Sequence, residues 1–106
     1  MNKVRVIESA FVARIAAWWL KLPSAAIVFG SSIFIYGTSK VAFLQNTKWL
    51  RHELQHVVQY QRYGFSGFVG RYIIYHIRYG YINNPLEVEA RAAETNESLH
   101  DRFQIS

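Results

Sequence analysis

The sequence contains no cysteine. This absence excludes disulfide bonds, zinc–thiolate sites and thiol nucleophiles, so any metal site must use histidine and carboxylate side chains. Acidic residues are also few, with 7 Asp and Glu against 12 Lys and Arg, and the net charge is +5. Because the basic residues are dispersed and no predicted helix carries a dense row of them, we expect no nucleic-acid partner.

Linkers, low-complexity tracts and internal repeats are also absent, so nothing divides the chain. A length of 106 residues allows one small domain, which we place over residues 1–106. The hydrophobic fraction of 51% and the aromatic fraction of 16% exclude a disordered chain. A small core without disulfides is normally marginal, so we expect a metal, a partner or unusually aromatic packing to stabilise it.

Residues 5–22 predict an amphipathic helix that Pro23 ends. Its apolar positions, at helical spacing, are Ile7, Phe11, Ile15, Trp18 and Leu22. Glu8 and Arg14 interrupt the apolar stretch, which argues against a secretory signal peptide and favours a cytoplasmic protein. We expect this N-terminal helix (residues 1–23) to complete the core. The alternatives are that it covers a cleft of the domain, lies on a membrane surface or mediates self-association.

The stretch between Lys21 and Lys40 has no charged residue and reaches the lower length limit of a transmembrane helix. Proline, glycines and serines interrupt it, and two β-branched runs, residues 26–29 and 33–36, flank a Gly-Ser-Ser turn. This pattern favours a β-hairpin over a membrane span.

Three further helices are predicted from hydrophobic periodicity. They cover residues 41–63, residues 66–79 and the stretch from Asn84 to about His100. Gly64 would end the first of these helices, and Asn84-Pro85 would open the last as N-cap and first turn. The order indicates an α+β domain, mostly helical with a small antiparallel sheet, whose core occupies residues 24–106.

The chemical signal lies in the predicted helix 41–63, where His52-Glu53-Leu54-Gln55-His56 forms the motif H-E-x-x-H. Residues four apart share a helix face, so both imidazoles can reach one ion with bonds of about 2.0–2.1 Å. Glu53 lies about 100° around the helix, where it can act on a water rather than bind the metal. We therefore predict that His52 and His56 hold a zinc ion (Zn2+) and that Glu53 is catalytic.

A catalytic zinc site needs a third protein ligand and an open position for water. The candidates after the motif are His76, Glu87, Glu89, Glu94, Glu97, His100 and Asp101. Glu87 has a competing structural interpretation, because Asn84 as N-cap and Glu87 at N3 resemble a capping box. Glu89 lies about 200° around the helix from Glu87, so only one of them can face the site. Spacing alone does not choose between these glutamates.

The motif is followed, about thirty residues later, by Asn84-Pro85-Leu86-Glu87-Val88-Glu89-Ala90-Arg91, and together they resemble gluzincin metallopeptidases. The size and order are similar to the soluble minigluzincins and to the catalytic core of the CaaX-processing membrane metallopeptidases. In that branch a glutamate opening an E-x-x-A segment is the third zinc ligand, which implies this role for Glu87. An Asp usually follows that alanine and supports a ligating histidine, and here Arg91 stands in its place.

The resemblance also implies a zincin-like fold and an extended peptide bound at a sheet edge, in residues 26–29 or 33–36. A latent form, in which a terminal segment blocks the cleft, is implied as well. A tetrahedral oxyanion needs a donor besides zinc. The candidates are the polar aromatic residues between the ligand helices, namely Tyr72, Tyr75, His76, Tyr79 and Tyr81. Among them we select His76 and Tyr79. Packing with the polar group at the surface is the alternative for each of them.

These observations predict a zinc-dependent peptidase that acts on a peptide or protein. The main alternative is a non-catalytic module, stabilised by zinc on the same ligands, that binds a peptide or a partner domain. A third interpretation is a basic membrane-surface or nucleic-acid-binding protein in which the motif is accidental.

Overall fold

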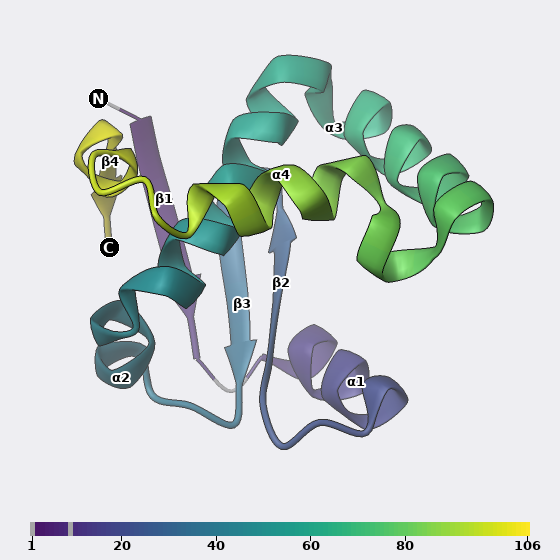
Figure 1. The fold of residues 1–106 in the computed structure, drawn as a ribbon. Helices are drawn as coiled ribbons and strands as arrows, with labels where there is room; N and C mark the ends of the chain where they lie inside the picture. The colour runs from purple at the N-terminus through teal and green to yellow at the C-terminus, as the bar shows by residue number, and fades with distance from the viewer. Residues whose placement is uncertain (1, 9) are drawn as a thin grey trace.

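The computed structural model describes residues 2–8 and 10–106 and shows an α+β fold that is mostly helical (Figure 1). The strands are β1 Asn2–Ile7, β2 Ala25–Phe29, β3 Ser32–Tyr36 and β4 Phe103–Ile105. The helices are α1 Phe11–Leu20, α2 Lys40–Gln45, α3 Thr47–Asn83, α4 Pro85–Ala93 and a short 3-10 helix, η1, at Leu99–Arg102. The predicted α+β class is confirmed.

The strands form one mixed sheet in the order β2-β3-β1-β4. The predicted hairpin is confirmed, because β2 and β3 pair antiparallel from Ala25↔Tyr36 to Phe29↔Ser32. β1, however, runs parallel to both β3 and β4, so the prediction of an antiparallel sheet is wrong. β2 is an outer strand and β3 an inner one. None of the described helices combines the length with the apolar character that crossing a bilayer requires.

Residues 5–7 belong to β1, so the predicted start of the N-terminal helix at residue 5 is wrong. Val4 and Val6 are buried and alternate with the exposed Lys3 and Arg5. This period of two is typical of a strand with one face in the core. β1 therefore fills the place between β3 and β4, and the helix begins only at Phe11.

α1 buries its small side chains and exposes its large ones. Ala13 and Ala17 are buried where the helix packs against β2 and β3. Phe11, Trp18 and Trp19 are 72%, 76% and 75% exposed. A surface helix of a globular protein normally turns its large apolar residues inward, so the usual arrangement is reversed here. Among the described residues of this helix, only small side chains are fully buried in the core.

The stretch predicted as one helix over residues 41–63 contains two helices. α2 ends at Gln45, and the side chain of Asn46 caps α3 by accepting the N–H of Trp49 at 3.2 Å. The backbone of α3 is non-helical at Gly64 and Gly80, where φ is +74° and +79°. The predicted helix end at Gly64 is confirmed, and the break at Gly80 directly follows residue 79, the predicted limit of the next helix. Residues other than glycine rarely adopt such φ values. We call residues 47–63 the first segment of α3 and residues 65–83 the second.

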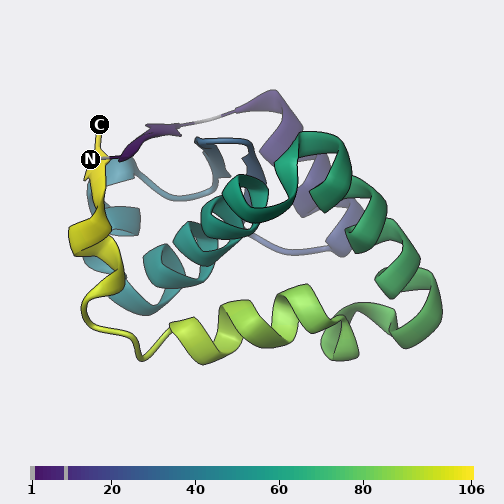
Figure 2. The same ribbon diagram turned by 90° about the horizontal axis from the view of Figure 1, so that it is seen from above.

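α4 begins as predicted, with the Asn84 side chain accepting the N–H of Leu86 at 3.0 Å and with proline in the first turn. It ends at Ala93, so the prediction that it extends to about His100 is wrong. Leu99 and Phe103 are buried in the core, which draws η1 against α3 and β4 against β1. β1 and β4 therefore lie side by side (Figure 2).

The first segment of α3 lies between the sheet and α4 (Figure 2). Leu50, Leu54 and Val57 are buried in the main hydrophobic core, while the opposite side of the helix packs against α4. Because both sides are covered, the polar side chains that face α4 are buried as well. These are Gln55, His56 and Gln59, and Glu53 beside them is buried too.

Candidate metal centre

Three side chains from two helices converge between α3 and α4. His52 and His56 lie one turn apart on the first segment of α3, and Glu87 lies in the first turn of α4. Nε2 of His52 is 2.9 Å from Oε1 of Glu87, and Nε2 of His56 is 3.2 Å from the same oxygen. One candidate ligand atom from each of the three residues lies within 4.8 Å of the others. The structure thus brings together the three residues predicted as metal ligands.

The second ring nitrogen of each histidine contacts a different residue. Nδ1 of His52 is 2.9 Å from Oε2 of Glu94, and Nδ1 of His56 is 2.9 Å from Oε1 of Gln59. The Gln59 amide is itself fixed, because it donates to the carbonyl of Leu86 at 2.9 Å. These acceptors hold a proton on each Nδ1 and direct both Nε2 atoms to the common point, which is the orientation that metal ligands need.

Glu94 contacts the candidate metal centre in a way that the sequence did not reveal. It was a candidate third ligand, but it contacts the outer nitrogen of His52. Glu94 follows Glu87 by seven residues, or two helical turns, so both lie on one helix face, and this spacing was the available signal. It gives His52, a candidate ligand, the carboxylate support that Arg91 does not provide. Arg91 donates instead to the carbonyl of Ile82.

Glu87 is engaged by the site and does not cap its helix. Its Oε2 accepts the hydroxyl proton of Tyr72 at 2.6 Å. The backbone N–H of Asn84, which a capping box would join to Glu87, donates to the carbonyl of Tyr81 at 3.3 Å. The capping-box interpretation is therefore wrong, and both carboxylate oxygens of Glu87 face α3.

The charges in this group stabilise one another. Burial alone would raise the pKa of Glu87 and lower the pKa values of His52 and His56. The hydrogen bonds between these residues outweigh burial, and they hold the pKa of Glu87 well below its usual range. The pKa of His52 is raised to about 9, and that of His56 is raised as well. A cation at the common point would replace the two Nε2 protons that face Glu87.

Glu53 lies beside this group without joining it. Its side chain is buried, and it lines both cavities that reach the site. Burial raises the pKa of its carboxyl to about 7, against the opposing effects of the His56 and His52 charges. A carboxyl with a pKa near neutrality can accept a proton and return it at neutral pH.

The donors and their spacing fit a zinc ion. Two imidazole nitrogens and one carboxylate oxygen form a ligand set found in catalytic zinc sites. With bonds of about 2.0–2.1 Å, tetrahedral ligands lie about 3.3–3.4 Å apart. The separations of 2.9 and 3.2 Å between the Glu87 oxygen and the two histidine nitrogens need only a small expansion. The group can therefore hold a metal ion, and its nitrogen donors argue against calcium and magnesium.

Two cavities meet at this group. An apolar cavity of about 280 Å³ lies between β2, Leu20 of α1 and Ile73 in the second segment of α3. A second, more polar cavity of about 390 Å³ reaches Lys48 at the start of α3. The residues that line both cavities are His52, Glu53 and Tyr81. The candidate metal centre is therefore reached from two sides.

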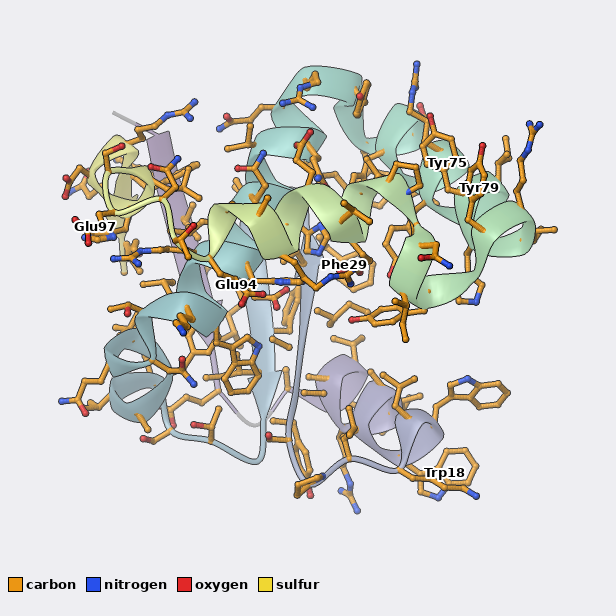
Figure 3. The ribbon with its side chains drawn as sticks, in the orientation of Figure 1. Trp18, Phe29, Tyr75, Tyr79, Glu94 and Glu97 are labelled. Carbon is orange, nitrogen blue, oxygen red and sulfur yellow. The ribbon has the colours of Figure 1, made fainter. Side chains whose placement is uncertain are left out.

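The remaining candidate ligands lie outside the group. Glu89 accepts hydrogen bonds from Gln55 at 2.7 Å and from Arg62 at 3.1 Å, on a different side of α4 from Glu87. Figure 3 shows Glu97 far from Glu94, beyond the end of α4. The candidates His100 and Asp101 lie on η1, and His76 lies on the second segment of α3.

Among the polar aromatic residues, the structure brings Tyr72 and Tyr81 to the site. His76 and Tyr79, the residues predicted as oxyanion stabilisers, are exposed and line neither cavity. Tyr72 is committed to Glu87. Tyr81 lines both cavities, and burial together with the Glu87 charge raises its pKa to about 12, so its hydroxyl remains a proton donor at neutral pH.

Comparisons with known proteins found no match. The sequence matches no protein-family profile, and neither a curated protein nor a solved structure matches the chain. The resemblance to gluzincins therefore rests on the motif residues alone.

Proposed function

We propose that the protein is a zinc-dependent peptidase of the gluzincin type, with zinc held by His52, His56 and Glu87. The observation that carries the proposal is the convergence of two Nε2 atoms and a carboxylate oxygen beside the buried Glu53. When bound, zinc polarises the scissile carbonyl and lowers the pKa of a coordinated water.

The chain's own residues supply the proton transfers and the orientation. Glu53 takes a proton from the attacking water and then gives it to the leaving amine, a use for which a pKa of about 7 is suited. The Tyr81 hydroxyl donates a hydrogen bond to the oxyanion that develops on the carbonyl oxygen. Glu94 and Gln59 hold the two imidazoles in place throughout.

In this proposal the substrate lies along β2. This outer strand lines the apolar cavity and can add an extended peptide as a further strand. The carbonyl of Val28 already accepts the Tyr60 hydroxyl at 2.9 Å, so the added strand pairs with other positions of β2. The apolar cavity takes a large apolar side chain of the peptide.

α1 lines one side of the site without closing the other. Ala16 and Leu20 form part of the apolar cavity, whereas the polar cavity has no α1 residue in its lining. The metal centre is thus accessible while α1 stays in place, which favours an active form over a latent one.

The test compares the wild-type protein with Glu53→Gln and with the matched control Glu97→Gln, which changes an exposed glutamate outside the site. The purified proteins are analysed for zinc and assayed on fluorescently labelled casein and on a quenched-fluorescent peptide library. We expect one zinc per chain in all three proteins. Glu53→Gln lowers hydrolysis by about 10²–10⁴-fold because the general base is lost, and Glu97→Gln leaves it unchanged.

Two results would contradict the proposal. Zinc below about a tenth of an ion per chain, without exposure to chelators, would show that the three residues do not form a stable zinc site. Stoichiometric zinc without hydrolysis of any peptide by the wild-type protein would support the non-catalytic, zinc-stabilised module instead.

A further inference from the structure

A second unusual feature is the group of large apolar side chains exposed on α1 and on the second segment of α3, the two helices that flank the apolar cavity. We call it the rim surface and define it by six exposed residues: Phe11, Trp18, Trp19, Leu20, Ile73 and Ile77. Leu20 and Ile73 both line the cavity and are 54% and 53% exposed, so the apolar lining continues outward on both sides of the mouth. Monomeric proteins seldom expose apolar patches of this kind unless they bind something.

The two elements of the rim surface lie on the same side of the molecule. Figure 1 places α1 below and the second segment of α3 above on this side, with α2, η1 and β4 on the other. Figure 3 shows Trp18 projecting outward from α1. Tryptophan is one of the residues that concentrate at the boundary between lipid and water.

The charges on the two elements that carry the rim surface all have one sign. In residues 10–22 and 65–83 the charged side chains are Arg14, Lys21, Arg71 and Arg78, and there is no Asp or Glu. The nearest acidic residue before α1 is Glu8, which is engaged by the backbone N–H of Lys40 at 2.8 Å. A surface with large apolar residues, aromatic rings and only basic charges is complementary to an anionic lipid surface.

We infer that the rim surface docks on an anionic lipid bilayer, with α1 and the second segment of α3 in the headgroup region on both sides of the cavity mouth. A second copy of the chain fits this surface less well, because the same four basic residues would face each other across the interface. Docking directs the mouth of the apolar cavity toward the lipid. The inference depends on neither zinc nor hydrolysis.

The test measures binding of the full chain to vesicles by co-sedimentation and by tryptophan emission. One vesicle set contains phosphatidylcholine alone, and the other contains about 30% phosphatidylglycerol to supply anionic headgroups. We expect the protein to sediment mainly with the anionic vesicles. The emission of Trp18 and Trp19 shifts to shorter wavelength as they leave water, while Trp49, which packs against Phe43, changes little.

Variants at exposed positions separate the apolar contribution from the electrostatic one. Trp18→Ser combined with Trp19→Ser weakens vesicle binding by about tenfold or more, whereas Val41→Ser, at an exposed residue of α2, is the matched control and changes it less than about twofold. Arg71→Ser combined with Arg78→Ser weakens binding to the anionic vesicles only. Lys3→Ser combined with Lys48→Ser removes the same net charge elsewhere and has a smaller effect.

The inference is overturned if the wild-type protein does not sediment with the anionic vesicles at low salt. It is overturned equally if the control substitutions weaken binding as much as those on the rim surface, since binding would then reflect net charge alone. A dimer that forms without vesicles and is lost in the double tryptophan variant, with no vesicle binding, would assign the surface to a second copy.

Discussion

The interface between α3 and α4 and the rim surface depart from usual protein architecture in opposite directions. The interface buries charged and polar groups, with Glu53, His56 and Glu87 all under a tenth exposed. The rim surface exposes Trp18 and Ile77, which are 76% and 80% accessible. His56 and Glu87 are tolerated because hydrogen bonds join them, with His52, around a common point. Glu53 stands outside these bonds, and burial raises the pKa of its carboxyl. The buried region has the donor atoms that a cation needs. For the rim surface, the proposed partner is a lipid surface.

The largest expected effect comes from removing the central carboxylate of the buried region. Glu87→Ala leaves two buried imidazoles without their counter-charge, which costs about 3–5 kcal/mol of unfolding free energy in the metal-free protein. It also removes the third ligand, so zinc content falls below about a tenth of an ion per chain. Urea unfolding and metal analysis measure the two effects. Glu97→Ala, the exposed control, stays within about 0.5 kcal/mol, and full zinc retention in Glu87→Ala would reject the ligand assignment.

A smaller effect is expected at the residue that orients His52. Glu94→Ala lowers zinc affinity by about 10–100-fold, because the imidazole loses the acceptor at Nδ1. Competition with a chromophoric chelator measures this affinity. Glu94→Gln keeps an acceptor oxygen and loses less. If both variants bind zinc as the wild-type protein does, Glu94 does not orient the ligand.

The pH dependence of stability tests the buried region without a mutation. The pKa of His52 is raised from 6.5 to about 9, so its pairing with Glu87 stabilises the metal-free protein fully below pH 6.5. This stabilisation, about 1–2 kcal/mol after allowance for partial exposure, is lost as pH rises through 9. Zinc binding requires neutral imidazoles, so added zinc stabilises the protein more as pH rises over the same range.

Urea unfolding at several pH values, once with a chelator and once with zinc, measures how the unfolding free energy and the added stabilisation by zinc change with pH. The two quantities are expected to change in opposite directions. His76→Ala changes an exposed histidine outside the site and is the matched control, for which both slopes are retained. Parallel slopes with and without zinc would show that the ion does not displace protons from His52 and His56.

The smallest effect is expected on the rim surface. Ile77→Ala alters the unfolding free energy by no more than about 0.5 kcal/mol, because the side chain is 80% exposed. Ile33→Ala, at a fully buried position of β3, costs about 2–5 kcal/mol. Thermal unfolding of both variants measures the contrast. A similar cost for both would mean that the rim surface is packed in the folded protein.

Local signals in the sequence predicted the hairpin and most helix limits. Gly64 and Asn84 are predictable because each meets a local backbone requirement: Gly64 adopts the positive φ that ends a helix, and the Asn84 side chain caps the helix that follows it. β1 and β4 were missed because their stability comes from pairing with distant segments, and β4 has only three residues, too few to show a period. The alternation of Val4 and Val6 with Lys3 and Arg5 is a strand signal. It is short, and the helical spacing of apolar residues that starts at Ile7 favours a helix over the same stretch.

The candidate metal centre was more predictable than the fold, because its residues have fixed spacings along helices. His52 and His56 follow from the i, i+4 rule, and Glu87 came from the resemblance, since spacing alone left the glutamates equal. The contact of Glu94 with His52 and the position of Tyr81 depend on how α4 packs against α3. Local sequence patterns do not predict this packing. The large apolar residues of α1 are predicted to lie in the core, yet they face outward. Periodicity identifies an apolar face of a helix but does not show whether another element covers it.

The pairing of β1 with β4 has a consequence for the order of folding. It joins Asn2 to Phe103, whereas the ligands of the candidate metal centre are 31 and 35 residues apart. Closing the longer loop costs more chain entropy and slows the formation of the contacts that depend on it. We therefore expect α3 and α4 to join first and β4 to add last. In native-state hydrogen exchange, the amides of β4 should then open while those around the histidines remain protected.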